Sequence, residues 1–245
     1  KIFMKKILVY FISTVMFFCS FVNSEYTFAQ DLISKHTYII TKGNIQFATT
    51  VNTLYKSNGK SVFQVLSSTS GIFKLKKDIR KETSLFKILN DKVISEEYTF
   101  SRQKKDSYES YLTKISRDKT KKSSTRVTKN NQDETIYHPY LKNVQDRLSV
   151  QLDYKSKLKA GQYNQVYIVL DKGRLREYRY NKQSIDTVPT IFGDTKCIVV
   201  KRTIKNNKRS TITWYAIEHD FIPVIINQYR KNNLQFTVQL DSVGD

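Results

Sequence analysis

The sequence predicts a mainly β protein, built as a large curved antiparallel sheet or an open β-barrel with one amphipathic helix. Short runs rich in Val, Ile, Thr, Tyr and Phe are separated by clusters of Asn, Gly, Lys and Asp, which is the pattern of strands joined by turns. Strands do not alternate with long helical patterns, and this disfavours a parallel α/β fold. The N-terminus is basic and then apolar, which indicates export.

The N-terminal region has the order of a signal peptide. A basic start is followed by an apolar run up to Val22, and small residues then stand at Ser24 and Ala29. The alternative is a membrane anchor, but a spanning helix needs about 20 apolar residues and this run is shorter. We therefore assign residues 1–29 to a signal peptide cleaved near Ser24 or Ala29, and residues 30–245 to a single antiparallel β domain in the periplasm.

Twelve β-favouring runs are expected to be strands, and turn residues separate most of them. The runs in the first half are His36–Thr41, Ile45–Lys56, Ser61–Ser68, Ile72–Ile79, Ser84–Leu89 and Val93–Arg102. Those in the second half are Gln165–Leu170, Leu175–Tyr180, Lys196–Lys205, Ser210–Glu218, Phe221–Tyr229 and Asn233–Leu240. In the last run apolar and polar residues alternate, which predicts a sheet with one face on a core and the other in water.

One segment departs from the β pattern. Apolar residues at Leu141, Val144, Leu148 and Leu152 recur at steps of three and four, and Pro139 stands just ahead as a helix-start signal. The spacing predicts an amphipathic helix over about Leu141 to Tyr154 that lies on the sheet.

The chain is strongly basic, with a formal net charge of +20. Loss of the first 29 residues would remove three lysines and one glutamate, which leaves +18. The most charge-biased stretch lies between Arg102 and Lys129, where we expect short edge strands joined by basic turns. Its exposed lysines either protect a sheet edge or form an anion-binding patch. The candidate patch consists of Lys104, Lys105, Lys119, Lys121 and Lys122.

No catalytic, metal or nucleotide motif is present in the sequence. The three histidines, His36, His138 and His219, lack metal-ligand spacing, and no nucleophile elbow or phosphate-binding glycine loop occurs. The pair His219 and Asp220 is expected in an exposed hairpin turn. Cys197 is the one cysteine beyond the signal peptide, and we expect it to be a small buried hydrophobe. The sequence therefore predicts a protein that is not an enzyme and holds no cofactor or metal, and nucleic acid is not an expected partner.

The run from Trp214 to Val224 resembles the closing motif of domain-of-unknown-function family 3108, whose members are exported proteins of Gram-negative bacteria. In this motif a tryptophan and an apolar-alanine pair precede a short acidic turn and a Pro-Val pair, here Pro223-Val224. The resemblance covers most of the chain after the signal peptide, although Phe192-Gly193-Asp194 replaces the more usual Pro-x-Gly turn. It implies a large curved antiparallel sheet or open barrel with little helix, and it brings no activity or catalytic residues. Trp214, Pro223 and Val224 are then expected to be structural.

Three hypotheses for function remain open at this stage. The first is a periplasmic binding or carrier module for an apolar or amphiphilic envelope component, such as a lipid or lipopolysaccharide. The second is an envelope interaction protein that docks on anionic polymers, on a membrane surface or on a partner through its basic edge. The third is a hydrolase. A cavity lined by apolar side chains would favour the first, a filled core with a basic surface the second, and a polar cleft with converging ionisable groups the third.

Overall fold

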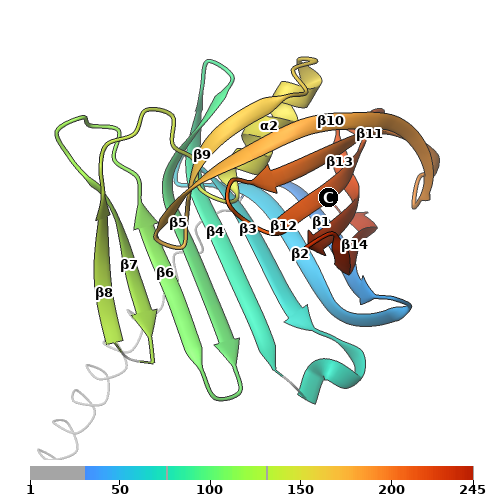
Figure 1. The fold of residues 1–245 in the computed structure, drawn as a ribbon, viewed down its shortest axis with the longest axis horizontal. Coiled ribbons are helices and arrows are strands. Elements are labelled where there is room, and N and C mark those ends of the chain that lie inside the picture. Colours follow the sequence, from blue (N-terminus) through green and yellow to red (C-terminus); the bar gives the residue numbers. More distant parts are fainter. Residues whose placement is uncertain (1–30, 76, 131, 245) are drawn as a thin grey trace, which may run out of the picture.

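The computed structural model describes residues 31–75, 77–130 and 132–244 (Figure 1), and all of its strands belong to one sheet. The sheet has fourteen strands in the order β8-β7-β6-β5-β4-β3-β2-β1-β14-β13-β12-β11-β10-β9. The strands of the first half are β1 (Asp31–Lys42), β2 (Ile45–Ser57), β3 (Lys60–Thr69), β4 (Asp78–Leu89), β5 (Lys92–Lys104), β6 (Tyr108–Lys114), β7 (Ser123–Lys129) and β8 (Gln132–His138). Those of the second half are β9 (Gln165–Asp171), β10 (Arg174–Thr190), β11 (Gly193–Ile204), β12 (Arg209–Ala216), β13 (Ile222–Arg230) and β14 (Asn233–Gly244). The helices are η1 (Gly71–Leu75) and α2 (Ser149–Lys159).

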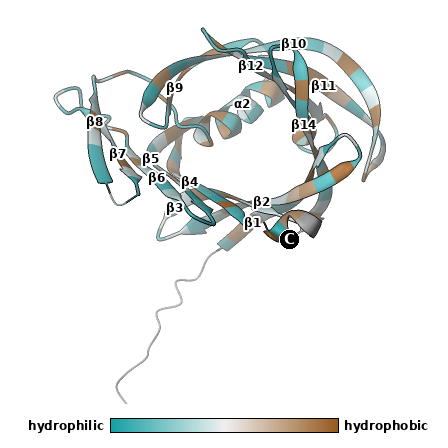
Figure 2. Cartoon of the chain, turned by 60° about the horizontal axis from the view of Figure 1, so that its bottom comes forward, coloured by the Kyte–Doolittle hydropathy of each residue, from teal (hydrophilic) through white to brown (hydrophobic). Residues whose placement is uncertain are grey.

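The sheet is an antiparallel meander in two halves that meet at β1 and β14. All other strands that pair in the sheet also follow one another along the chain. In the β1–β14 pair, Tyr38 lies opposite Leu240. The edge strands are β8 and β9. The sheet is strongly curved, and α2 lies on its concave side (Figure 2). The predicted fold class, a large curved antiparallel sheet with one helix, is confirmed.

Local turn chemistry explains why neighbouring strands pair. In the β2–β3 turn, Asn58 and Gly59 have φ of 51° and 71°, and Asn90 and Asp91 of the β4–β5 turn have φ of 50° and 58°. Two consecutive positive φ values are typical of the two-residue hairpin turns whose twist matches that of the strands. Both turns lie at the Asn-Gly and Asn-Asp pairs where the sequence predicts them.

The helix is shifted from its predicted position. It spans Ser149–Lys159 and not Leu141 to Tyr154, and none of the described helices is long and apolar enough to cross a membrane. The preceding segment is irregular: the chain turns at Asn143, where φ is 63°, and Gln145 then forms a parallel bridge with Val169 of β9. Val144 and Leu148 are buried as predicted, but they reach the core from this irregular segment, which ends at the N-cap of α2. A spacing of three and four was therefore misread as one continuous helix.

Three other strand predictions need correction. The run Ile72–Ile79 is not one strand, because Gly71–Leu75 forms the short helix η1 and β4 begins only at Asp78. Strand β8 was not predicted, and β10 continues to Thr190, ten residues beyond the predicted end at Tyr180. Both additions are rich in polar residues, so their apolar content was too low to indicate a strand.

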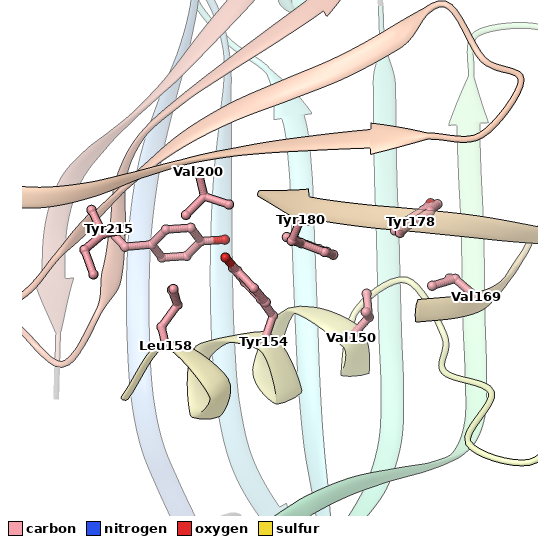
Figure 3. Close-up of a cluster of buried hydrophobic side chains, with 9 residues drawn as sticks. Val150, Tyr154, Leu158, Val169, Tyr178, Tyr180, Val200 and Tyr215 are labelled. Carbon is pink, nitrogen blue, oxygen red and sulfur yellow. The ribbon is translucent and has the colours of Figure 1, made fainter. Parts of the chain in front are cut away.

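Buried aromatic side chains fill the space between α2 and the sheet. In Figure 3, Tyr154 of α2 lies between Tyr180 of β10 and Tyr215 of β12, with ring centroids 4.1 Å and 6.0 Å away. Val150 and Leu158 complete the helix face of this cluster. A second cluster joins Leu148 to side chains of β3 to β7, namely Phe63, Phe86, Val93, Tyr98, Phe100, Tyr111 and Val127. The helix thus packs against both halves of the sheet.

Candidate functional site

A buried carboxylate positions the start of α2 on the concave face. Asp146 is fully buried and accepts hydrogen bonds from the hydroxyls of Ser84 (2.6 Å) and Ser95 (2.5 Å) on β4 and β5. Its other oxygen accepts the backbone N–H groups of Leu148 (2.7 Å) and Ser149 (2.9 Å), which begin the helix. Because one carboxylate serves both the helix start and two strands, the helix cannot rotate without breaking buried hydrogen bonds.

Further polar contacts join the same segment to both halves of the sheet. Gln145 donates from its side chain to the carbonyl of Val93 (2.7 Å) on β5, while its backbone bonds to β9. Asp153 of α2 accepts from the Val93 N–H (3.2 Å) and from the Tyr167 hydroxyl (2.9 Å) of β9. At the other end of the helix, Asp220 in the β12–β13 turn pairs with Lys155 (2.7 Å) and with Lys159. The helix is therefore held by both halves of the sheet and at both of its ends.

Part of the concave face is not covered by the helix. No cluster that contains an α2 side chain includes a residue of β1, β13 or β14 among the described residues. Strand register places Val200, Thr213, Ile226, Val238 and Ile40 opposite one another across β11, β12, β13, β14 and β1. Val200 and Thr213 are buried, whereas the other three are only half-buried. This row forms an apolar wall with accessible surface.

A polar row runs beside the apolar wall. Register places Tyr180, Arg202, Thr211, Gln228 and Phe236 opposite one another on β10 to β14. Arg202 donates to the Thr211 hydroxyl (2.8 Å), which donates to the Gln228 side-chain carbonyl (3.1 Å). The Arg202 guanidinium lies over the ring of Tyr178, 4.9 Å from its centroid. An arginine is thus held in one orientation by side chains of three strands.

A network of paired charges lies between the β4–β5 side and the β9–β10 hairpin. Arg147 Nε is 3.8 Å from Glu82 Oε2 and 3.6 Å from Asp171 Oδ1, and the Tyr98 hydroxyl donates to Glu82 (2.6 Å). The charge of Glu82 is the main cause that raises the pKa of Arg147. Asp171 also pairs with Arg176 (3.2 Å). These ion pairs join the hairpin to the sheet, and within them Asp171 Oδ1 and Arg176 Nε are buried without a hydrogen-bond partner.

A second candidate site is a cleft of about 320 Å³ at the β5–β6 and β7–β8 turns. It is lined by Arg102, Lys104, Ser107, Tyr108, Glu109, Lys129 and Asn130. Arg102 makes two hydrogen bonds to Asp78 (2.9 and 2.6 Å), which hold the pKa of that carboxyl far below its ordinary value. Glu109 pairs with Lys172 (3.7 Å). Within the described residues no ion pair involves Lys104 or Lys129, so the cleft carries unneutralised positive charge.

The five predicted patch lysines lie in two groups. Lys104 and Lys105 follow β5 at one end of β6, and Lys119, Lys121 and Lys122 lie in the loop at its other end. The seven residues of β6 separate the two groups by about 23 Å at ~3.3 Å per residue. Of the five, Lys104 lines the cleft, and anion binding by either group stays a prediction.

The residues that carried the family resemblance lie in or against a core. Val224 is 1% exposed and packs with Tyr38, Cys197, Ala216, Ile222 and Leu240. Trp214 is half-buried against this cluster, and its ring nitrogen is buried without a hydrogen-bond partner. Pro223 lies opposite Tyr215 at a register shift in β13, where a missing N–H is tolerated. None of the three residues belongs to the polar row or to the basic cleft.

The histidines and the cysteine do not converge. His138 is buried near Thr125, His219 stacks on Phe192 with ring centroids 3.8 Å apart, and burial is the main cause that lowers the pKa of His36. Cys197 is fully buried as predicted, and burial raises the pKa of its thiol to about 11. No group of three metal-ligating side chains occurs among the described residues.

The sequence interpretation missed Arg202, which the structure places at the centre of the polar row. One signal was available in the sequence. Arg202 stands two and four residues after Val200 and Ile198, so strand alternation places all three on the same face, and that face is buried at Ile198 and Val200. A charged residue in phase with buried neighbours indicates either a partner or a ligand.

No curated protein matches the chain. One similar solved structure is that of a protein thought to be exported, with a YmcC-like fold, from Bacteroides fragilis. It shares 12% sequence identity at a TM-score of 0.36, over 86% of this chain and 95% of that one. The signal-peptide assignment falls on residues 1–30, outside those described, and stays a prediction. Residues 28–240 match the family described as Protein of unknown function (DUF3108), and the chain belongs to that family.

Proposed function

We propose that the protein is an exported, non-catalytic binding or carrier module for an amphiphilic component of the cell envelope, held on the concave face of the sheet. The observation that supports this is the apolar wall of Ile226, Val238 and Ile40, which is only half-buried and which belongs to no cluster with an α2 side chain among the described residues. Burial of an acyl chain against such a wall contributes about 0.8 kcal/mol per methylene group. A chain of ordinary length would thus supply enough free energy for stable binding.

The direct test is binding of a fluorescent acyl probe together with mass spectrometry of the native protein. We expect extractable lipid in protein isolated from an envelope, and we expect Ile226→Asp to abolish probe binding because the new carboxylate lies in the apolar wall. The matched control is Ile212→Asp on β12. Ile212 is also half-buried, but it stands between the concave-facing Thr211 and Thr213 and therefore lies on the opposite face of the sheet. Protein that holds no lipid and binds no probe would refute the proposal.

A second candidate function is docking on an anionic envelope polymer, supported by the cleft that contains Lys104 and Lys129. Exposed charges attract over about 10 Å at 0.1 M salt, so such binding should weaken steeply as salt rises. Replacement of both lysines by glutamate should abolish binding to lipopolysaccharide. Lys121→Glu with Lys122→Glu, at the other end of β6, is the control of equal charge. Binding that salt does not change, or that both double variants lose equally, would contradict docking in the cleft.

A further inference from the structure

We infer that Arg202 receives the anionic end of the ligand, so that the ligand is a single-chain amphiphile with a terminal carboxylate or phosphate. This inference rests on the proposed function and adds the chemistry of the headgroup. It is supported by how Arg202 is held, by the lack of a protein carboxylate beside it, and by the apolar wall that begins next to it.

The orientation of Arg202 is set by a directed chain of hydrogen bonds. The Gln228 side-chain nitrogen donates to the backbone carbonyl of Ser210 (2.9 Å), so the amide oxygen of Gln228 is the atom left to accept the Thr211 proton (3.1 Å). Thr211 has then used its only proton and must accept from Arg202 (2.8 Å). This bond uses one donor of a planar group that has five. Among the remaining donors, Nε is buried without a hydrogen-bond partner.

The charge of Arg202 is not balanced by the protein. No described carboxylate lies within ion-pair distance of it, and Asp171, on the neighbouring network, is already shared by Arg147 and Arg176. A guanidinium partly removed from water is costly unless it is paired. Tyr180 lies directly opposite Arg202 and is 3% exposed; burial raises the pKa of its hydroxyl, and the charge of Arg202 beside it opposes that rise. A carboxylate or phosphate at this point would pair with the guanidinium and accept from the Tyr180 hydroxyl.

The apolar wall extends from the same place. Val200 stands two residues before Arg202 on β11, and Ile40 lies four strands away along the row of Val200. At ~4.8 Å between neighbouring strands the row is about 19 Å long. The geometry thus offers a cation at one end and an apolar track that leads away from it, which fits a headgroup and an extended acyl chain.

The test is calorimetric titration of the full chain with three probes of equal chain length: lauric acid, lauroyl lysophosphatidic acid and monolaurin. The first two distinguish a carboxylate from a phosphate, and the third is uncharged. We expect at least one anionic probe to bind about tenfold more tightly than monolaurin, as a charge-assisted hydrogen-bonded pair implies. Arg202→Met should remove this preference, so that the anionic probes bind no more tightly than monolaurin. Arg209→Met, at the exposed start of β12, should leave the preference unchanged.

The possible failures can be told apart. Equal binding of all three probes, or a preference that survives in Arg202→Met, would overturn the headgroup assignment and leave the proposed function standing. Binding of no probe would overturn both. If Arg202→Met does not fold, Tyr180→Phe removes only the second donor, and it should reduce the preference for an anionic probe over monolaurin by about threefold or more. An unchanged preference in Tyr180→Phe would then count against the site.

Discussion

Replacement of Asp146 should destabilise the protein more than any ordinary surface change. In Asp146→Ala four buried donors lose their acceptor: the hydroxyls of Ser84 and Ser95, and the N–H groups of Leu148 and Ser149. The hydroxyls can rotate to other acceptors, but the backbone groups cannot, and an unsatisfied buried donor costs about 1–3 kcal/mol. Two such groups predict a loss of about 4 kcal/mol, which corresponds to a melting temperature lower by about 8–16 °C for a domain of this size.

Urea unfolding followed by circular dichroism measures this loss. Asp146→Asn keeps one oxygen for the two N–H groups and presents its NH₂ to hydroxyls that can accept, so its cost should be about 1–2 kcal/mol. Asp106→Ala, in the exposed β5–β6 turn, should lie within about 0.5 kcal/mol of the unmodified protein. An Asp146→Ala variant within about 1 kcal/mol of the parent, or an asparagine variant as unstable as the alanine one, would refute the assigned role of this carboxylate.

Four further predictions concern single positions. Gly173→Ala should lower the free energy of unfolding by about 1–2 kcal/mol, because φ there is +72° and a Cβ would lie 3.0 Å from Ile136 Cδ1; equal stability in urea would contradict this. The buried Cys197 thiol, with its pKa raised to about 11, should not react with Ellman's reagent at pH 8 until the protein is unfolded, and rapid native labelling would show that it is accessible. Trp214→Ala should cost about 2–4 kcal/mol, less than at a fully buried site, and an unchanged melting curve would remove Trp214 from the core. Because the pKa of Asp78 is lowered by Arg102, this pair should stabilise the fold fully above about pH 4 and lose its contribution only as the pH falls further; an Arg102→Met variant with the same acid-unfolding profile would count against it.

Most of the strands and hairpins could be predicted because their causes are local. Positive φ at Asn58 and Gly59 depends on those two residues, and alternation in β14 depends on neighbours two positions apart. The position of α2 could not be predicted in this way. It depends on hydrogen bonds from Ser84 and Ser95, which are 62 and 51 residues away from Asp146 in the chain. The apolar spacing from Leu141 to Leu152 indicated full or partial burial correctly, but it could not tell a helix from an irregular segment that packs on the same core.

The sequence by itself determined the fold class, the order of the hairpins, the strong positive charge and the burial of Cys197, because these follow from composition, alternation and turn residues. Only the tertiary structure decided which charged residues act together. It separated Lys104 from Lys121 by the length of β6, and it placed Arg202 against Thr211 and Gln228. Strand alternation predicts the face of the sheet on which a side chain lies. The residues that the side chain contacts on that face depend on the register of several strands and on the curvature of the sheet. The candidate ligand site is formed by that register, which no single segment of the chain encodes.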